Sequence, residues 1–177
     1  MGRPWRSEES VLGKFSPCGT YRYWLVVQWH ALFPELYQPG KTMAIVALNP
    51  SKADLQRDDA TLRKCVNWGR SHGFGQLLML NAYPFRSTDP KVMLAADDPF
   101  GEQSPEDLVK LCDGASVVVA AWGNHAQHRG RGAHIAEAFD KAGIQLKCWA
   151  TNRDGSPGHP LYLSLGDVKP WRCGGFL

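Results

Sequence analysis

The chain has 177 residues, of which 44% are hydrophobic and 11% aromatic, and this length and composition suffice for the core of one domain. Its formal net charge of +3 permits contact with phosphate groups, although a dedicated duplex-DNA binder would usually carry a stronger basic bias. No apolar run is long enough to span a membrane, and the N-terminus lacks the apolar core of a signal peptide. We therefore expect a soluble, cytoplasmic protein without a membrane partner.

Apolar runs typical of strands recur along the chain. The first, YRYWLVVQWH at 21–30, is rich in β-branched and aromatic residues. The Pro- and Gly-containing stretch 33–41 separates it from MAIVALN at 43–49, and the two runs are predicted to be antiparallel neighbours. From residue 43 onward the runs are apolar on both faces, as in parallel strands covered by helices. These later runs lie at 43–49, 77–81, 116–123 and 144–151.

Segments with helical spacing and recognisable ends lie between these runs. Asp58 or Asp59 is expected to cap a helix that runs to about Ser71. Further helices are predicted from Asp89-Pro90 to Ala95, from Ser104 to Gly114, and over 132–142.

The alternation of strands and helices predicts a three-layer α/β/α fold. We expect a central, mostly parallel four-stranded sheet, with an additional N-terminal strand or hairpin. Residues 1–177 are interpreted as a single α/β domain, in which 1–20 form an N-terminal extension and 166–177 a C-terminal tail.

The five cysteines are widely scattered and include no C-x-x-C pair. This pattern favours reduced thiols, mostly in the core, over disulfides, a zinc site or an iron–sulfur cluster. No pair of histidines has zinc-binding spacing with an acidic partner. We therefore expect neither a metal site nor a cofactor.

Polar and aromatic residues follow each of the four later strands. In open parallel sheets, ligands bind beyond the carboxyl ends of the strands, so these residues are candidates for a common site. They are Asn49, Pro50 and Ser51 after the first strand, Asn81, Tyr83 and Phe85 after the second, Trp122, Gly123 and Asn124 after the third, and His159 beyond the fourth.

Each of these features also has a purely structural explanation. Asn-Pro-Ser is common turn chemistry, a loop histidine is often simply hydrogen-bonded, and aromatic residues most often belong to the core. Asn81 is less easily explained, because an unsatisfied amide in an apolar strand costs about 1–3 kcal/mol. The coincidence of all four strand ends favours a site for a planar, hydrogen-bonding ligand, on which Tyr83, Phe85 and Trp122 would stack.

Several segments resemble known families. Arg22-Tyr23 and the runs ALNPSKAD, DDATLRKC, STDP and HPLYLS resemble the bacterial family called domain of unknown function sixteen-forty-three. More distantly, the strand-end segments LNPS, LLMLN, AAWGNHAQ and GHPLYLS resemble, over about residues 43–165, the signature segments of the uracil-DNA glycosylase superfamily.

The glycosylase resemblance implies a role for individual residues. Asn49 matches the asparagine that positions the attacking water, Asn81 the asparagine that reads the base edge, and His159 the histidine that stabilises negative charge on the departing base. Trp122-Gly123 and Ala126-Gln127 match the W-G-x-x-A-Q motif. The first strand-end segment, LNPS, lacks the aspartate found in the most active branch of the glycosylase superfamily. The carboxylates nearest to this segment in sequence are Asp54, Asp58 and Asp59.

Three functional hypotheses follow. The first is a glycosylase-like hydrolase that cleaves the N-glycosidic bond of a base in DNA, a nucleotide or a nucleoside, with Asn49 and His159 as catalytic residues and no metal. The second is a non-catalytic module that binds a nucleotide or modified base. The third is a structural or interaction domain that uses the tail 171–177.

Overall fold

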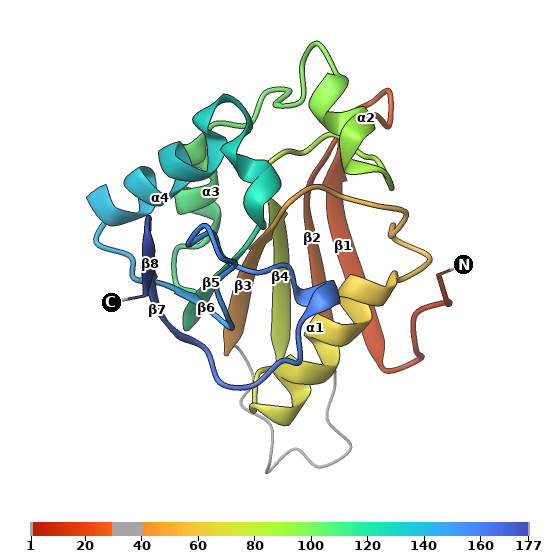
Figure 1. Ribbon diagram of the computed structural model, residues 1–177. Coiled ribbons are helices and arrows are strands. Elements are labelled where there is room, and N and C mark those ends of the chain that lie inside the picture. The colour runs from red at the N-terminus through yellow and green to blue at the C-terminus, as the bar shows by residue number, and fades with distance from the viewer. Residues whose placement is uncertain (1, 30–40, 177) are drawn as a thin grey trace.

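The computed structural model describes residues 2–29 and 41–176, and the strands within them form one sheet in the order β1-β2-β4-β3-β5-β6-β7-β8. Figure 1 shows β1 toward one side of this sheet and the short strands β7 and β8 at the other. The strands are β1 (Glu9–Phe15), β2 (Arg22–Trp29), β3 (Thr42–Ala47), β4 (Gln76–Asn81), β5 (Val117–Ala121), β6 (Leu146–Cys148), β7 (Lys169–Arg172) and β8 (Gly175–Phe176).

The sheet is mixed rather than mostly parallel. β3 pairs parallel with β4 and β5, and β5 pairs parallel with β6. All the other pairings, β1 with β2, β2 with β4, β6 with β7 and β7 with β8, are antiparallel. The α/β class is thus confirmed, but the expectation of a mostly parallel four-stranded sheet was too narrow.

The predicted pairing of β2 with β3 is wrong. The β3–α1–β4 crossover places β4 on one side of β3, and β5 occupies the other side, so neither edge of β3 is left for β2. Strand β2 instead pairs antiparallel with β4, and β1 pairs antiparallel with the other edge of β2. The stretch 33–41, which was expected to join the two strands, lies for the most part outside the described residues.

The helices begin where the capping residues predict. The Asp59 carboxylate accepts a hydrogen bond from the Leu62 amide at 2.9 Å and so caps α1. At the start of α3, Ser104 and Asp107 form a reciprocal capping box. The helices are α1 (Ala60–Ser71), α2 (Pro90–Ala95), α3 (Pro105–Leu111) and α4 (Arg131–Lys141), with 3-10 turns η2 (Asn124–Gly130) and η3 (Pro160–Tyr162).

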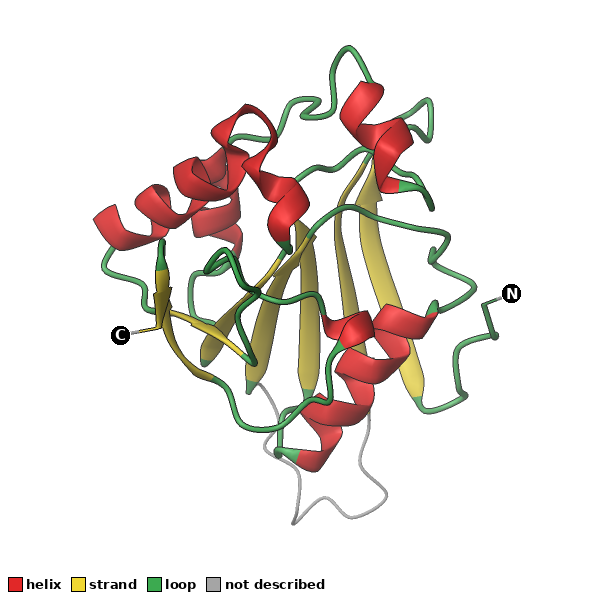
Figure 2. Ribbon diagram, in the orientation of Figure 1, coloured by secondary structure: helices red, strands yellow, loops and turns green. Residues whose placement is uncertain are grey.

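Apolar side chains cover both faces of the sheet. On β3, Ala44 and Val46 belong to a core cluster that residues of α2, α3 and α4 complete, whereas Met43 and Ile45 belong to a second cluster completed by α1. Figure 2 shows helices on both sides of the strands. Because neither face of β3 meets water, its apolar run is continuous instead of alternating.

Both terminal segments contribute to the sheet. β1 lies within residues 1–20, and β7 and β8 lie within residues 166–177. Trp171 of β7 is only 3% exposed, and its ring packs edge-on against Trp122 with 5.5 Å between centroids. The surface that the interaction-domain hypothesis placed in this tail is therefore partly core.

Two expectations from composition can be compared with the structure. Within residues 2–29 and 41–176, no helix is both long and apolar enough to cross a membrane. The cysteines are all free, as predicted: Cys65, Cys112 and Cys148 are buried, whereas Cys18 and Cys173 are exposed.

Candidate functional site

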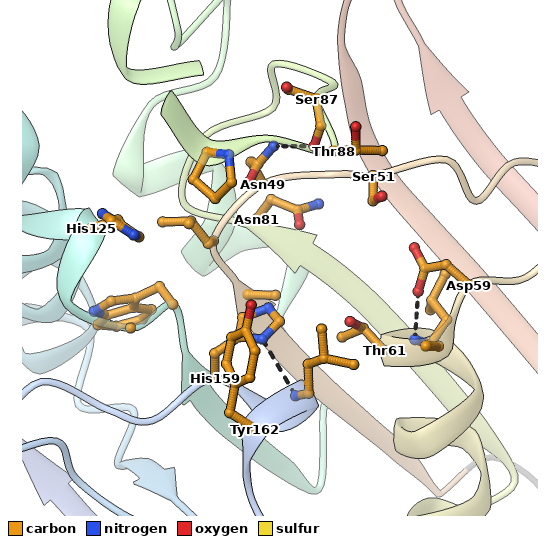
Figure 3. Close-up of a pocket in the computed structure, with 18 of the residues that line it drawn as sticks. Asn49, Ser51, Asp59, Thr61, Asn81, Ser87, Thr88, His125, His159 and Tyr162 are labelled. Atoms are coloured by element: carbon orange, nitrogen blue, oxygen red, sulfur yellow. Dashed lines mark hydrogen bonds between the residues drawn. The ribbon is translucent and has the colours of Figure 1, made fainter. Parts of the chain in front are cut away.

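A cavity of about 340 Å³ lies at the carboxyl ends of the central strands. The ends of β3, β4 and β5 line it, and the N-terminus of α1 and the segment 159–163 form further walls. Figure 3 shows Asn49 and Asn81 on one side, and His159 and Tyr162 opposite them. The structure brings together these predicted site residues: Asn49, Ser51, Asn81, Trp122, Gly123, Asn124 and His159.

The Asn49 amide has a fixed orientation. Its Nδ2 donates to the backbone carbonyl of Ser87 at 2.8 Å and also lies 3.2 Å from that of Pro50 and 3.3 Å from that of Phe85. Three carbonyls around one nitrogen identify it as the NH₂ group, so the remaining atom is the carbonyl oxygen. Asn49 therefore offers the cavity a hydrogen-bond acceptor, Oδ1, as required to position a water molecule.

The Asn81 amide, at the end of β4, is buried, and its nitrogen makes no hydrogen bond to the described residues. Asn81 is only 1% exposed. An unmade hydrogen bond at such a depth costs about 1–3 kcal/mol. Because Asn81 lines the cavity, a ligand with an acceptor atom would supply the missing partner.

A backbone hydrogen bond after β5 helps to position His159 at the cavity. The Gly123 amide donates to the Pro157 carbonyl at 2.8 Å, which ties the end of β5 to the residues that precede His159. Gly123 has a φ of 71°, a conformation that L side chains rarely adopt, and a Cβ at this position would lie 3.9 Å from the Cβ of His159. The 3.9 Å separation is an ordinary contact, so the positive φ alone explains why glycine suits the third strand end.

The hydrogen bonding of His159 defines its tautomer. Nδ1 accepts a hydrogen bond from the Leu161 amide at 3.3 Å, so the proton of the neutral ring resides on Nε2. Burial lowers the pKa of His159 to about 4, and Lys64 also lowers this pKa whereas the Asp59 carboxylate raises it. At neutral pH the ring is therefore an uncharged hydrogen-bond donor.

This shift makes stability depend on pH. Between the ordinary pKa of 6.5 and about 4, the unfolded chain binds a proton at His159 whereas the folded chain does not. Folding is therefore expected to weaken as pH falls through this window, by an amount on the order of 2 kcal/mol from this group. Thermal unfolding at pH 7 and pH 4.5 should show a larger loss for the wild type than for His159→Asn. Equal losses would contradict the assignment.

Lys64 holds the wall that contains His159. Its Nζ donates to the carbonyl of Leu163 and lies 3.5 Å from that of Leu161, so α1 is fastened to the residues that follow His159. This contact joins two walls of the cavity, the helix α1 and the segment of the η3 turn. Tyr162, within that turn, is 83% exposed at the cavity's edge.

Three predicted substrate-binding residues do not line the cavity. Tyr83 is fully buried in the core, and its hydroxyl donates to the His128 carbonyl at 2.7 Å. Phe85 packs edge-on against Tyr21, and Pro50 is buried, with its carbonyl accepting from the Ser87 amide. Tyr83 has no exposed ring face on which a ligand could stack, and the half-buried Phe85 ring packs beside the cavity.

Asp59 is the carboxylate that the sequence left unplaced. It is the only Asp or Glu among the described residues that line the cavity. Its Oδ1 caps α1, and its other oxygen makes no hydrogen bond to a described residue. Asp58 instead forms an ion pair with Arg63 at 2.6 Å, and Asp54 accepts backbone hydrogen bonds from Gln56 and Arg57.

Further polar residues of the cavity were missed as site residues in the sequence. Their signals are weak, because hydroxyl and amide residues in loops are common and usually serve the turns themselves. An arginine inside an apolar strand run was the one strong signal. These residues are Arg22, Thr61, Ser87, Thr88, His125 and Asn152.

The sequence model of one protein family, described as Protein of unknown function (DUF1643), matches residues 22–161. The chain belongs to this family. The DUF1643 match begins at Arg22 and ends at Leu161, so only Tyr162 and Leu163 of the cavity wall lie outside it. Comparison with curated proteins gave no match, and comparison with solved structures gave none either. For this DUF1643 protein, these comparisons do not show the expected resemblance to uracil-DNA glycosylases.

Proposed function

We propose that the cavity binds a nucleobase and that the protein hydrolyses the N-glycosidic bond that joins this base to its sugar. The observation that carries the proposal is the buried Asn81 amide at the cavity wall, whose Nδ2 has no hydrogen-bond partner in the part of the chain that the structure describes. Amides read the edges of bases by hydrogen bonding, and a flipped or free base would supply the missing acceptor.

The other two strand-end residues complement this amide. His159 offers a neutral Nε2–H donor, and Asn49 offers the acceptor Oδ1. Glycosidic cleavage develops negative charge on the departing base, which a fixed donor stabilises, and it requires an oriented water, which an acceptor holds. These are the roles that the resemblance to the glycosylase signature segments implies for the same residues.

The proposed reaction is a simple hydrolysis. A water molecule held by Asn49 Oδ1 transfers a proton to Asp59 as its oxygen bonds to the anomeric carbon of the sugar. The bond between that carbon and the base nitrogen breaks, and the electron pair leaves with the base while His159 Nε2–H donates to it. The proton on Asp59 then returns to the base or to solvent, so the products are the free base and the sugar hydroxyl.

The test measures released base by mass spectrometry. The substrates are single- and double-stranded oligonucleotides with uracil, hydroxymethyluracil, hypoxanthine or mismatches, together with free nucleotides and nucleosides. Asp59→Asn is expected to lower the rate about 10²–10⁴-fold, because it removes the general base. Asparagine caps helices as well as aspartate does, so α1 should persist.

Asp89→Asn provides the matched control. Asp89 caps α2 as Asp59 caps α1, but its side chain does not line the cavity. Unchanged base release by Asp89→Asn together with loss in Asp59→Asn would support the assigned base. Tight binding of a substrate without any release of base would instead favour a binding module, and the hydrolase proposal would be abandoned.

A further inference from the structure

Arg22 is a buried cation in the wall of the cavity. Its side chain enters from β2, the strand that pairs with β4, and the residue is only 2% exposed. Nη1 donates to the Ala53 carbonyl at 3.2 Å, whereas Nε is buried with no hydrogen-bond partner among the described residues. The guanidinium thus retains unused donors at the site.

A second buried arginine shows how this chain satisfies a purely structural guanidinium. Arg131 is 6% exposed and donates from Nε to the Ala82 carbonyl at 2.7 Å and from Nη2 to the Gln103 carbonyl at 2.9 Å. Its guanidinium also lies 5.2 Å from the Phe100 ring centroid. Counting described residues alone, Arg22 has one carbonyl partner for its guanidinium, whereas Arg131 has two carbonyl partners and an aromatic ring. Of these two arginines, Arg22 lines the cavity and Arg131 does not.

The charge of Arg22 is also unpaired. Among the described residues, no carboxylate oxygen lies within 4.0 Å of its guanidinium. Burial lowers the pKa of Arg22 to about 10, an effect that the more distant Asp59 and Asp54 oppose and that Arg86 strengthens. A buried charge without a paired partner is costly, and such sites are usually completed by a counter-ion or ligand.

Hydroxyl donors lie in the same cavity. Ser51 and Thr88 both line it, and neither side-chain hydroxyl makes a hydrogen bond to a described residue. Figure 3 shows these two residues beside Asn81. A guanidinium together with free hydroxyls matches the donors that bind phosphate oxygens in proteins.

We propose that Arg22 binds a phosphate group of the ligand, so that the substrate is a nucleotide rather than a nucleoside. This inference rests on the proposed function, since it assigns a phosphate subsite beside the base-binding amides. The phosphate has two sources, a free nucleoside monophosphate or the backbone of a single strand, and the chemistry at Arg22 is the same for both.

The experiment compares matched ligands by isothermal titration calorimetry. The wild-type protein is titrated with each of the common deoxynucleosides and deoxyuridine, with their 5′-monophosphates, and with short single-stranded oligonucleotides, and ligand integrity is checked by mass spectrometry. At least one monophosphate or oligonucleotide is expected to bind at least tenfold more tightly than its nucleoside. Preference for the monophosphate or for the strand identifies the source of the phosphate.

Two variants identify the residue responsible. Arg22→Gln should remove the preference for phosphate but retain the affinity for nucleoside, whereas Arg22→Lys should retain part of the preference. Arg86→Gln is the control, because it removes a neighbouring positive charge that does not line the cavity. An equal loss in Arg86→Gln and Arg22→Gln would attribute the effect to general charge and overturn the inference.

The outcomes separate the two proposals. Equal binding of nucleoside and nucleotide overturns the phosphate subsite but leaves the base-binding cavity in place. Binding of neither overturns both. The comparison of ligands on the wild-type protein needs no variant, so the preference for phosphate is decided even if Arg22→Gln fails to fold, and Arg22→Lys against Arg86→Gln then tests the assignment to Arg22.

Discussion

Replacement of His159 by asparagine is expected to lower the rate of base release about 10²–10³-fold while the fold persists. The magnitude is that of removing one fixed donor from a site where negative charge develops. Asparagine carries an oxygen near the position of Nδ1, so the bond from the Leu161 amide that caps η3 can be kept. The side chain is too short to place a donor where Nε2 lies.

The pH profile distinguishes this role from a merely structural one. Because the pKa of His159 is lowered to about 4, the neutral donor is present throughout the range above it. The rate for the wild type should therefore show no loss attributable to His159 between pH 8 and pH 5, where an ordinary histidine would become protonated. A drop near pH 6.5 in the wild type that is absent in His159→Asn would show that the ring is not held neutral.

Much of the fold could be predicted because its signals are local. Capping residues such as Asp59, Asp89 and Ser104 define helix starts through bonds within one turn, and buried strands are apolar throughout. The order of strands is a long-range property. The run 21–30 contains no signal that β4 will lie between β2 and β3, because this order depends on how the β3–α1–β4 crossover packs.

The candidate site was predictable in part for the same reason. Asn49, Asn81 and His159 follow strands, and parallel strands bring their carboxyl ends to one edge. The direction of a side chain depends on neighbours far along the chain, so Tyr83 could not be distinguished from a stacking residue, nor Asp59 from an ordinary cap. Arg22 comes from an antiparallel strand whose neighbours were predicted wrongly, and its approach to the cavity was therefore missed.

Replacement of Asn81 by leucine is expected to stabilise the protein while abolishing ligand binding. The buried Nδ2 has no partner among the described residues, so removing it relieves a desolvation cost of about 1–3 kcal/mol. Leucine is larger than asparagine, but Asn81 lines a cavity of about 340 Å³ into which the added volume can extend. At about 2–4 °C per kcal/mol for a chain of this size, the rise in Tm is measurable by calorimetry.

Asn49→Leu is the matched control, and it is expected to lower the stability that Asn81→Leu raises. Its Nδ2 bonds to the Ser87 carbonyl at 2.8 Å with two further carbonyls close by, so the same substitution removes this part-buried hydrogen bond and should cost about 0.5–1.5 kcal/mol. Both variants should lose binding of the base. An increase in stability at Asn81 with loss of binding identifies an amide maintained for a ligand at the expense of the fold, as functional sites often require. A decrease in stability at Asn81 as large as that at Asn49 would instead make Asn81 a structural amide and remove the main support for a base-binding site.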